Sequence, residues 1–220
     1  MKFDLHVHTE HSSDGSNKVE DIVRILKERG FGGAAILDHN SVDGAREALN
    51  LHPEGFIVVP SVEVSSAQGH ILALNVTDPI ERDLGVLETI EAIHRAGGIA
   101  VAAHPYRYWS GLGEKNILGR PFDAIEAHNA RSESGSNRKA LVLAQNLGAP
   151  ITGGSDSHDN QSLGAGYTIV PDDCRTKEDV IDSILHHRTE VGGTHRSSGD
   201  TMGYVAKSVS EWMGRGMKRM

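Results

Sequence analysis

The stretch GAAILDH, residues 33–39, is a run of small apolar residues that ends in Asp38 and His39. A continuous apolar run of this length is typical of a strand that is covered on both faces, as in a parallel sheet. The stretch IAVAAHP, residues 99–105, repeats the pattern and contains His104 near its end. Segments with helical periodicity flank both runs, and this alternation predicts βα units around a parallel sheet.

The same alternation continues along the chain. Apolar runs predict strands at residues 2–9, 33–38, 56–65, 70–76, 99–104, 124–129, 149–154 and 167–170. Apolar residues at helical spacing predict helices at residues 18–29, 83–96, 137–147 and 176–187. The last helix opens on Thr176 with Asp179 three residues later, which resembles a capping box.

Length and composition fit one globular domain. The chain has 220 residues, of which 38% are hydrophobic and 24% are charged. We expect a single domain over residues 1–196. We expect residues 197–220 to form a C-terminal tail, in which Val205, Val209 and Trp212 are spaced for one amphipathic helix packed on the domain or frayed.

Charge and cysteine content limit the partners and the compartment. A net charge of -8 makes long nucleic acid an unlikely partner, because such binding needs clustered Lys and Arg. A small phosphorylated substrate remains compatible, since bound cations reverse the local field. No run of 18 apolar residues occurs, so we expect no membrane span, and no signal peptide, because its cleavage would remove His6. The single cysteine, Cys174, permits no intramolecular disulfide, and we expect a cytoplasmic location.

Side chains that bind metals gather at the C-terminal ends of the predicted strands, where sites assemble in parallel barrels and sheets. Nine candidates lie there: His6, His8, Asp14, His39, Glu63, His104, His128, Asp156 and His158. His6 and His8 are two residues apart in a strand, so they share a face and can bind one ion together. Imidazole with carboxylate suits Mn²⁺, Zn²⁺ or Fe²⁺. Because nine ligands exceed the needs of one tetrahedral ion, we expect two or three divalent ions.

Six segments resemble, in order, the motifs of the PHP (polymerase and histidinol phosphatase) family: LHVHTEHSSDG, ILDHN, VEVSS, AHP, IEAHN and GSDSH. The resemblance covers about residues 2–160 of the chain. It implies a single-domain α/β protein that folds as a distorted (βα)₇ barrel, with a trinuclear phosphoesterase site.

The resemblance also implies which residues bind which ion. The first ion would be bound by His6, His8, Glu63 and Asp156. Glu63 would bridge to a second ion bound by His104 and His128. The third would be bound by Asp14, His39 and His158. The short spacings between Glu63, His104 and Asp156 leave no room for a capping domain, so we expect an open site.

From the expected ions we predict a mechanism in which a bridging hydroxide attacks phosphorus. We count Glu63 and Asp156 as catalytic through the ions, together with Arg131, our first candidate for a phosphate clamp. Arg107 is the second candidate for substrate binding, and His70 is a third, balanced against a purely structural role. Asp38 alternates away from His39, so we expect it to hydrogen-bond a ligand rather than bind an ion.

The leading hypothesis is hydrolysis of a phosphate monoester or a terminal nucleotide phosphate. The family resemblance also allows a nucleotidase or a 5′–3′ exonuclease that acts on short nucleic-acid ends, and the sequence does not choose among these substrates. The alternatives are a non-catalytic metal-binding PHP module and a hydrolase of C–N bonds. The complete ligand set argues against the first, and the absence of a lysine at a strand end near the cluster argues against the second.

Overall fold

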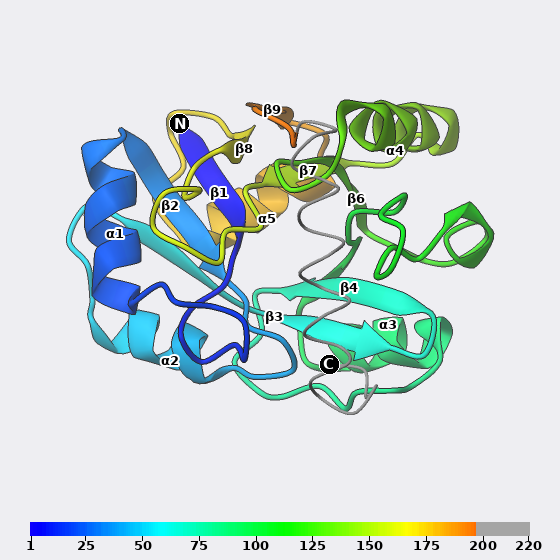
Figure 1. Ribbon diagram of the computed structural model, residues 1–220, viewed down its shortest axis with the longest axis horizontal. Helices are drawn as coiled ribbons and strands as arrows, with labels where there is room; N and C mark the ends of the chain where they lie inside the picture. The colour runs from blue at the N-terminus through cyan, green and yellow to red at the C-terminus, as the bar shows by residue number, and fades with distance from the viewer. Residues whose placement is uncertain (197–220) are drawn as a thin grey trace.

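One α/β domain is formed by the residues that the computed structural model describes, 1–196 (Figure 1). Its strands are β1 (Lys2–Val7), β2 (Phe31–Ile36), β3 (Ile57–Ser66), β4 (Gly69–Leu74), β5 (Ile99–Ala102), β6 (Ala124–Asn129), β7 (Ile151–Gly154), β8 (Gly166–Ile169) and β9 (Glu190–Gly193). Its helices are α1 (Val19–Glu28), α2 (Asp43–Asn50), α3 (Val86–Arg95), α4 (Ser134–Leu147) and α5 (Lys177–Leu185). The predicted tail helix lies outside the described residues.

The predicted strands and helices all form, with ends within three residues of those expected. The sequence pattern does not reveal α2 and β9. The buried residues of α2 are Gly44, Ala45 and Ala48, so the helix lacks a stripe of large apolar side chains. Strand β9 has the sequence EVGG and lies at the edge of the sheet, where its glycines provide little strand propensity.

The strands form one mixed sheet in the order β7-β6-β5-β4-β3-β2-β1-β8-β9. Strands β1 to β3 pair in parallel, as do β5 to β7. The expectation of a parallel sheet is wrong for β4, β8 and β9, which are antiparallel to their neighbours. Only Ala67 and Gln68 separate β3 from β4, and so short a link joins antiparallel strands, because a parallel pair needs a long crossover.

The sheet curls into a nearly closed barrel because β1 also meets the segment that follows β7. Val7 forms a parallel bridge with Ser157. The backbone N–H of His8 donates to the carbonyl of Ser157 at 3.0 Å, and the N–H of Asp156 donates to the carbonyl of His6 at 2.7 Å. This closure brings the C-terminal ends of β1 and β7 together.

The helices pack outside the sheet, with α1 and α2 beside β2 (Figure 1). Val19, Ile22 and Leu26 of α1 are fully buried against a cluster that includes Ala34 and Ile36 of β2. At the start of α5 the predicted capping box is present. Within residues 1–196, no helix combines the length and apolar character needed to cross a bilayer.

Candidate metal centre

Two histidines from the end of β1 face two carboxylates at one end of the barrel. The Nε2 atoms of His6 and His8 are 3.2 Å apart. Glu63 Oε2 lies 3.5 and 3.1 Å from these two nitrogens, and Asp156 Oδ1 lies 3.9 and 3.6 Å from them. Ligand atoms about 2.0–2.1 Å from a tetrahedral ion lie about 3.3 Å from one another. The two nitrogens and Glu63 Oε2 therefore have the spacing that one such ion needs. Asp156 Oδ1 lies somewhat farther from both nitrogens, and Asp156 forms a close group with His6 and His104.

Glu63 presents its two oxygens to different groups of side chains. Oε2 faces the β1 histidines and lies 3.2 Å from His39 Nδ1. Oε1 lies 2.7 Å from His70 Nδ1 and 3.1 Å from His104 Nε2. Each oxygen of this carboxylate thus has its own set of imidazole neighbours, and a cation held by either set would meet Glu63.

Asp14, in the loop after β1, lies between His39 and His158. Its Oδ2 is 3.0 Å from His158 Nε2, and its Oδ1 is 3.9 Å from His39 Nε2. Asp14 Oδ1 and His39 Nδ1 are buried and have no hydrogen-bond partner within the described residues. Such a buried, unsatisfied polar atom costs about 1–3 kcal/mol. A cation beside Asp14 would remove this cost for Asp14 Oδ1, whereas His39 Nδ1 lies on the side of the ring that faces Glu63.

The structure does not bring His128 to this cluster. Strand β6 has an irregularity between Glu126 and His128, where Ala127 has no partner in β7. The extra residue reverses the alternation, so Asn129 is buried near Asp156 and His128 bonds instead through Nε2 to the carbonyl of Thr194 at 2.8 Å. Within residues 1–196, no group of side chains that could hold an ion contains His128.

His70, considered from the sequence for substrate binding, lies among the candidate metal ligands. Its ring shares the carboxylate of Glu63 with His104, and the centroids of the two rings are 5.6 Å apart. With His39 and Glu63 it forms a group whose ligand atoms all lie within 4.8 Å of one another. His70 is thus a candidate metal ligand in its own right.

Glu126 is a buried carboxylate that the sequence analysis does not single out. Its Oε1 is 2.7 Å from His6 Nδ1, and its Oε2 accepts from the backbone N–H of His104 at 2.7 Å and from Asn129 Nδ2 at 3.1 Å. This contact places a proton on His6 Nδ1 and leaves Nε2 to face the other ligands. The available signal was an acidic residue between the apolar Ile125 and Ala127 of a predicted strand.

Asp38 supports a ligand without joining the cluster itself. Its Oδ1 accepts from the Thr9 N–H at 2.7 Å and from Ser12 Oγ at 2.8 Å, and its Oδ2 accepts from Thr9 Oγ1 at 2.8 Å. Ser12 Oγ lies 3.2 Å from His8 Nδ1. The chain of contacts orients the His8 ring as Glu126 orients that of His6.

Burial sets the charge of two of the histidines. It lowers the pKa of His104 to about 4, an effect to which the Arg107 guanidinium adds. Burial likewise lowers the pKa of His39 to about 4. Both rings are neutral at pH 7, which is the form that binds a metal ion.

Opposite charges outweigh burial at the centre of the cluster. Burial favours the neutral form of Glu63, but the surrounding histidines, His70 first, hold its pKa well below the ordinary value. Burial also disfavours a charge on His6, yet the nearby carboxylates, Glu126 first, raise its pKa well above the ordinary value. Without bound cations, the cluster therefore retains a proton on His6 that balances part of the carboxylate charge.

The backbone at two of the candidate ligands is strained. His104 and Asp156 have positive φ angles of 26° and 55°. Side chains of L-residues rarely tolerate this region, and each such residue costs about 1–3 kcal/mol. One residue separates His104 from the end of β5, and one separates Asp156 from the end of β7. The strain therefore lies just beyond the two strand ends, where the chain directs these side chains toward the cluster.

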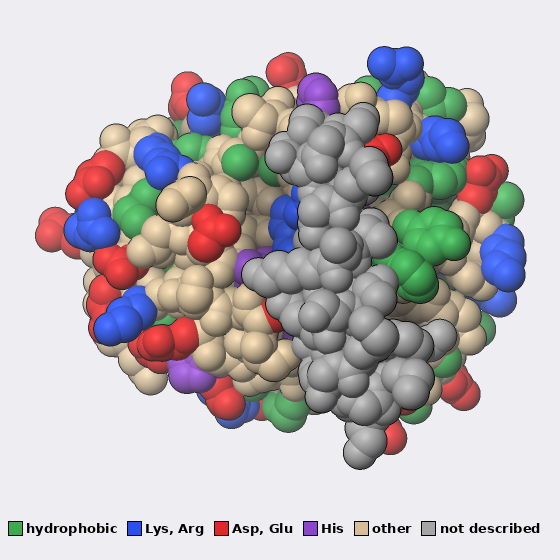
Figure 2. All heavy atoms as spheres, in the orientation of Figure 1, with side chains coloured by type: hydrophobic (Ala, Val, Ile, Leu, Met, Phe, Trp, Pro, Cys, Tyr) green, Lys and Arg blue, Asp and Glu red, His purple; other side chains and the backbone are tan. Residues whose placement is uncertain are grey.

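Two arginines approach the same carboxylate. Arg107 Nη2 lies 2.6 Å from Asp156 Oδ2 and Arg131 Nη1 lies 3.3 Å from Asp156 Oδ1. Arg131 Nη1 is also 2.6 Å from His158 Nδ1. With His6, these guanidinium groups outweigh the effect of burial and hold the pKa of Asp156 well below its ordinary value. Figure 2 shows histidine, basic and acidic side chains together near the centre of one face of the molecule.

The chain matches known proteins over most of its length. The family model described as the PHP domain matches residues 4–149, and one described as PHP-associated matches residues 134–189. An uncharacterized protein of Methanocaldococcus jannaschii is 35% identical over 147 residues, which make up 61% of this chain and 85% of that protein.

Two solved structures show the same fold. One is a two-domain protein from Bacteroides vulgatus described as containing a "predicted PHP-like metal-dependent phosphoesterase", with a TM-score of 0.74 and 16% identity over 88% of this chain. The match spans 65% of that protein. The other is an amidohydrolase from Chromobacterium violaceum with bound sulfate and no metal, with a TM-score of 0.64 and 20% identity over 86% of this chain and 97% of that one.

Proposed function

Because the chain belongs to the PHP domain family, as its six sequence motifs indicated, we propose that it is a metal-dependent phosphoesterase that hydrolyses a phosphate monoester or a terminal nucleotide phosphate. The observation that carries the proposal is the position of Glu63, whose two oxygens face two separate groups of histidines. Arg107 and Arg131 lie beside the same cluster. Several cations next to guanidinium groups suit a doubly charged phosphate ester.

Three groups of side chains would hold the ions. The first consists of His6, His8, Glu63 and Asp156. The second consists of Glu63, His70 and His104, with His70 in the place that the family resemblance assigns to His128. The third consists of Asp14, His39 and His158. Imidazole and carboxylate ligands of this kind suit Mn²⁺, Zn²⁺ or Fe²⁺.

The side chains divide the work of the proposed reaction. When bound, the ions would supply positive charge to the phosphoryl oxygens and acidity to a water molecule. Glu63 and Asp156 set the relative positions of the ligand groups. Arg131, which borders both Asp156 and His158, is placed to receive a phosphate oxygen with a bidentate pair of N–H donors. Arg107 is more enclosed and bonds Asn129 Oδ1 at 2.6 Å, so we assign it mainly to hold Asp156.

One structural neighbour was solved with a bound oxyanion. The Chromobacterium violaceum protein was solved with sulfate, an anion that resembles phosphate in shape and charge. Its description as an amidohydrolase names the competing reaction, cleavage of a C–N bond. Product analysis separates the two reactions, because only the first releases inorganic phosphate.

The test uses the full chain loaded with Mn²⁺ or Zn²⁺ and assayed on phosphomonoesters, dinucleotides, short RNA and simple amides. We expect release of phosphate from at least one ester. Glu63→Ala should abolish turnover and lower the bound metal by more than one ion per chain, as measured by inductively coupled plasma mass spectrometry. Glu91→Ala, an exposed position on α3, is the control and should change neither. Failure of the fully metallated protein to hydrolyse any phosphoester would refute the proposal.

A further inference from the structure

Two large aromatic side chains are exposed on the loop that follows His104. Tyr108 is 86% exposed and Trp109 is 64% exposed. Their rings meet edge to face, with centroids 4.8 Å apart and an interplanar angle of 86°. Aromatic rings contribute large binding energies when they are covered, so a pair left open to solvent points to a ligand surface.

Both neighbours of this pair in the chain contact the metal centre. On one side, Arg107 reaches Asp156 through its guanidinium group. On the other side, the carbonyl of Ser110 accepts from the backbone N–H of His70 at 3.0 Å, and the His70 ring bonds Glu63. Two residues span at most about 7 Å of chain. The aromatic pair is therefore held at the rim of the site.

The loop that carries the pair is firmly attached to the body. The N–H of Gly111 donates to the carbonyl of Arg107 at 3.1 Å, and the N–H of Gly113 donates to the carbonyl of Pro105 at 2.9 Å. A Cβ at Gly111 would lie 2.6 Å from the Arg107 carbonyl oxygen, so the turn is closed too tightly for a larger residue. Leu112, directly after it, is only 2% exposed and anchors the turn in the core.

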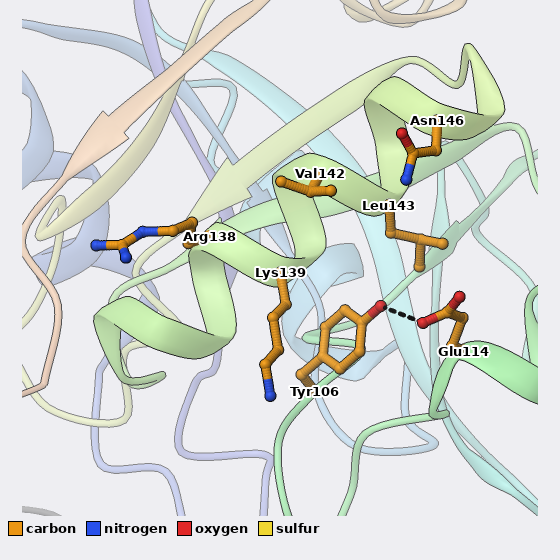
Figure 3. Close-up of a pocket in the computed structure, with 7 residues that line it drawn as sticks. All are labelled: Tyr106, Glu114, Arg138, Lys139, Val142, Leu143 and Asn146. Carbon is orange, nitrogen blue, oxygen red and sulfur yellow. Dashed lines mark hydrogen bonds between the residues drawn. The ribbon is translucent and has the colours of Figure 1, made fainter.

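Tyr106 fixes the start of the same loop. It lines a hollow of about 450 Å³ between the loop and α4, in which its hydroxyl donates to Glu114 Oε2 at 2.9 Å (Figure 3). The Lys139 ammonium lies 5.9 Å from the centroid of the Tyr106 ring. Tyr106 is thus held from both sides, whereas Tyr108 and Trp109 project from a rigid turn into solvent.

We propose that Trp109, supported edge-on by Tyr108, is a stacking platform for a flat aromatic ring on the alcohol side of the substrate, such as a nucleobase. This inference rests on the proposed phosphoesterase function, since it places the phosphate at the ions and Arg131 and the ring at the rim. Two side chains offer far less area than the roughly 1,000 Å² that a specific protein interface needs, which favours a small ligand over a protein partner. Stacking tolerates any base, so the platform selects a ring and not a sequence.

The test compares two substrates that differ only in the ring. Adenosine 5′-monophosphate and ribose 5-phosphate are assayed with the metal-loaded wild type, Trp109→Ala and Trp109→Phe. We expect Trp109→Ala to lower kcat/KM for the nucleotide about 5- to 100-fold, mainly through KM, because a contact remote from phosphorus is made equally before and in the transition state. Its kinetics on ribose 5-phosphate should stay within about twofold of wild type, and Trp109→Phe should retain most of the preference.

A binding measurement separates this inference from the proposed function. Trp212→Phe leaves Trp109 as the only tryptophan, so its fluorescence reports on this position alone. Quenching by the nucleotide but not by ribose 5-phosphate supports the stacking platform even if neither compound is hydrolysed. The absence of hydrolysis would then argue only against these two compounds as substrates. An equal loss on both substrates in Trp109→Ala, or no loss and no selective quenching, overturns the inference and leaves the phosphoesterase proposal standing. Concentration-dependent dimerisation that Trp109→Ala abolishes would assign the pair to a protein contact and also overturn it.

Discussion

Replacing Glu126 by Gln tests whether a residue that binds no ion nevertheless sets the affinity of the metal centre. The wild-type carboxylate accepts three hydrogen bonds, one from His6 Nδ1 and two from the His104 N–H and Asn129 Nδ2. A glutamine of the same shape has one accepting oxygen. If that oxygen serves His104 and Asn129, the amide NH₂ faces His6 Nδ1. The ring must then carry its proton on Nε2, the atom that faces Glu63 and Asp156.

The magnitude follows from the loss of one hydrogen bond to a charged group, about 1.5–3 kcal/mol. At about 1.4 kcal/mol per tenfold change, this loss weakens metal binding about 10- to 100-fold. The range agrees with the usual effect of removing a carboxylate behind a metal-binding histidine. We therefore expect Glu126→Gln to fold normally but to bind Mn²⁺ or Zn²⁺ more weakly by this factor.

The assay is competition with a chromophoric chelator, which gives the dissociation constant without relying on catalysis. Circular dichroism establishes that the variant is folded, and Glu91→Gln serves as the exposed control. At saturating metal, kcat should recover more than metal affinity does, because the ligands themselves are intact. Unchanged metal affinity in a folded Glu126→Gln protein would refute the idea that this carboxylate orients His6.

Three further predictions concern protons, packing and a helix cap. Binding of a divalent ion to the metal-free protein should release protons and weaken as the pH falls, because the ion displaces a proton from His6, whose pKa is raised. The test is calorimetry in buffers of different ionisation enthalpy. A binding enthalpy that does not depend on the buffer would contradict the prediction. Gly154→Ala should lower the free energy of unfolding by about 1–3 kcal/mol, because the added Cβ would lie 2.4 Å from the Cβ of His6. Gly135→Ala is the control, since an added Cβ there has nothing within 4 Å and should leave thermal unfolding almost unchanged. Thr176→Ala removes the side-chain acceptor at the start of α5 and should cost about 1 kcal/mol. The backbone N–H groups of Arg175 and Thr176 lower the pKa of Asp179. The stabilisation by this carboxylate is therefore present above the ordinary aspartate pKa and is lost as the pH falls through the lowered value. If an Asp179→Asn variant differed from wild type by the same free energy of urea unfolding at all pH values, this assignment would be contradicted.

Much of the arrangement of the candidate ligands could be predicted, because these residues lie at fixed places relative to the strands. His6 and His8 share a face through simple alternation, and their Nε2 atoms are indeed close together. His39, Glu63 and His104 follow or end apolar runs that are recognisable as buried strands. Their meeting at one end of the barrel then follows from the direction of those strands and needs no knowledge of distant contacts.

The position of His128 away from the cluster has a cause that the local sequence does not contain. Alternation puts Glu126 and His128 on the same face of β6, but the bulge at Ala127 separates them. The neighbouring strand ends in Gly153 and Gly154, and a Cβ at Gly153 would lie 3.1 Å from the His128 carbonyl oxygen. The bulged β6 backbone thus runs close to the two glycines that end β7, and this fit between two distant segments decides which residue of β6 faces the site.

The role of His70, by contrast, could have been derived from the sequence if the β3–β4 hairpin had been recognised. Four residues separate the two predicted strands there, too few for a crossover, so the pair has to be antiparallel. In the observed register His70 lies opposite Ser65, and residues opposite one another project to the same face. Ser65 shares that face with Glu63, two residues earlier, so the His70 ring is a diagonal neighbour of the Glu63 carboxylate, within reach of its oxygen. The direction of a single strand therefore decides whether His70 belongs to the pocket wall or to the proposed ligands of the second ion.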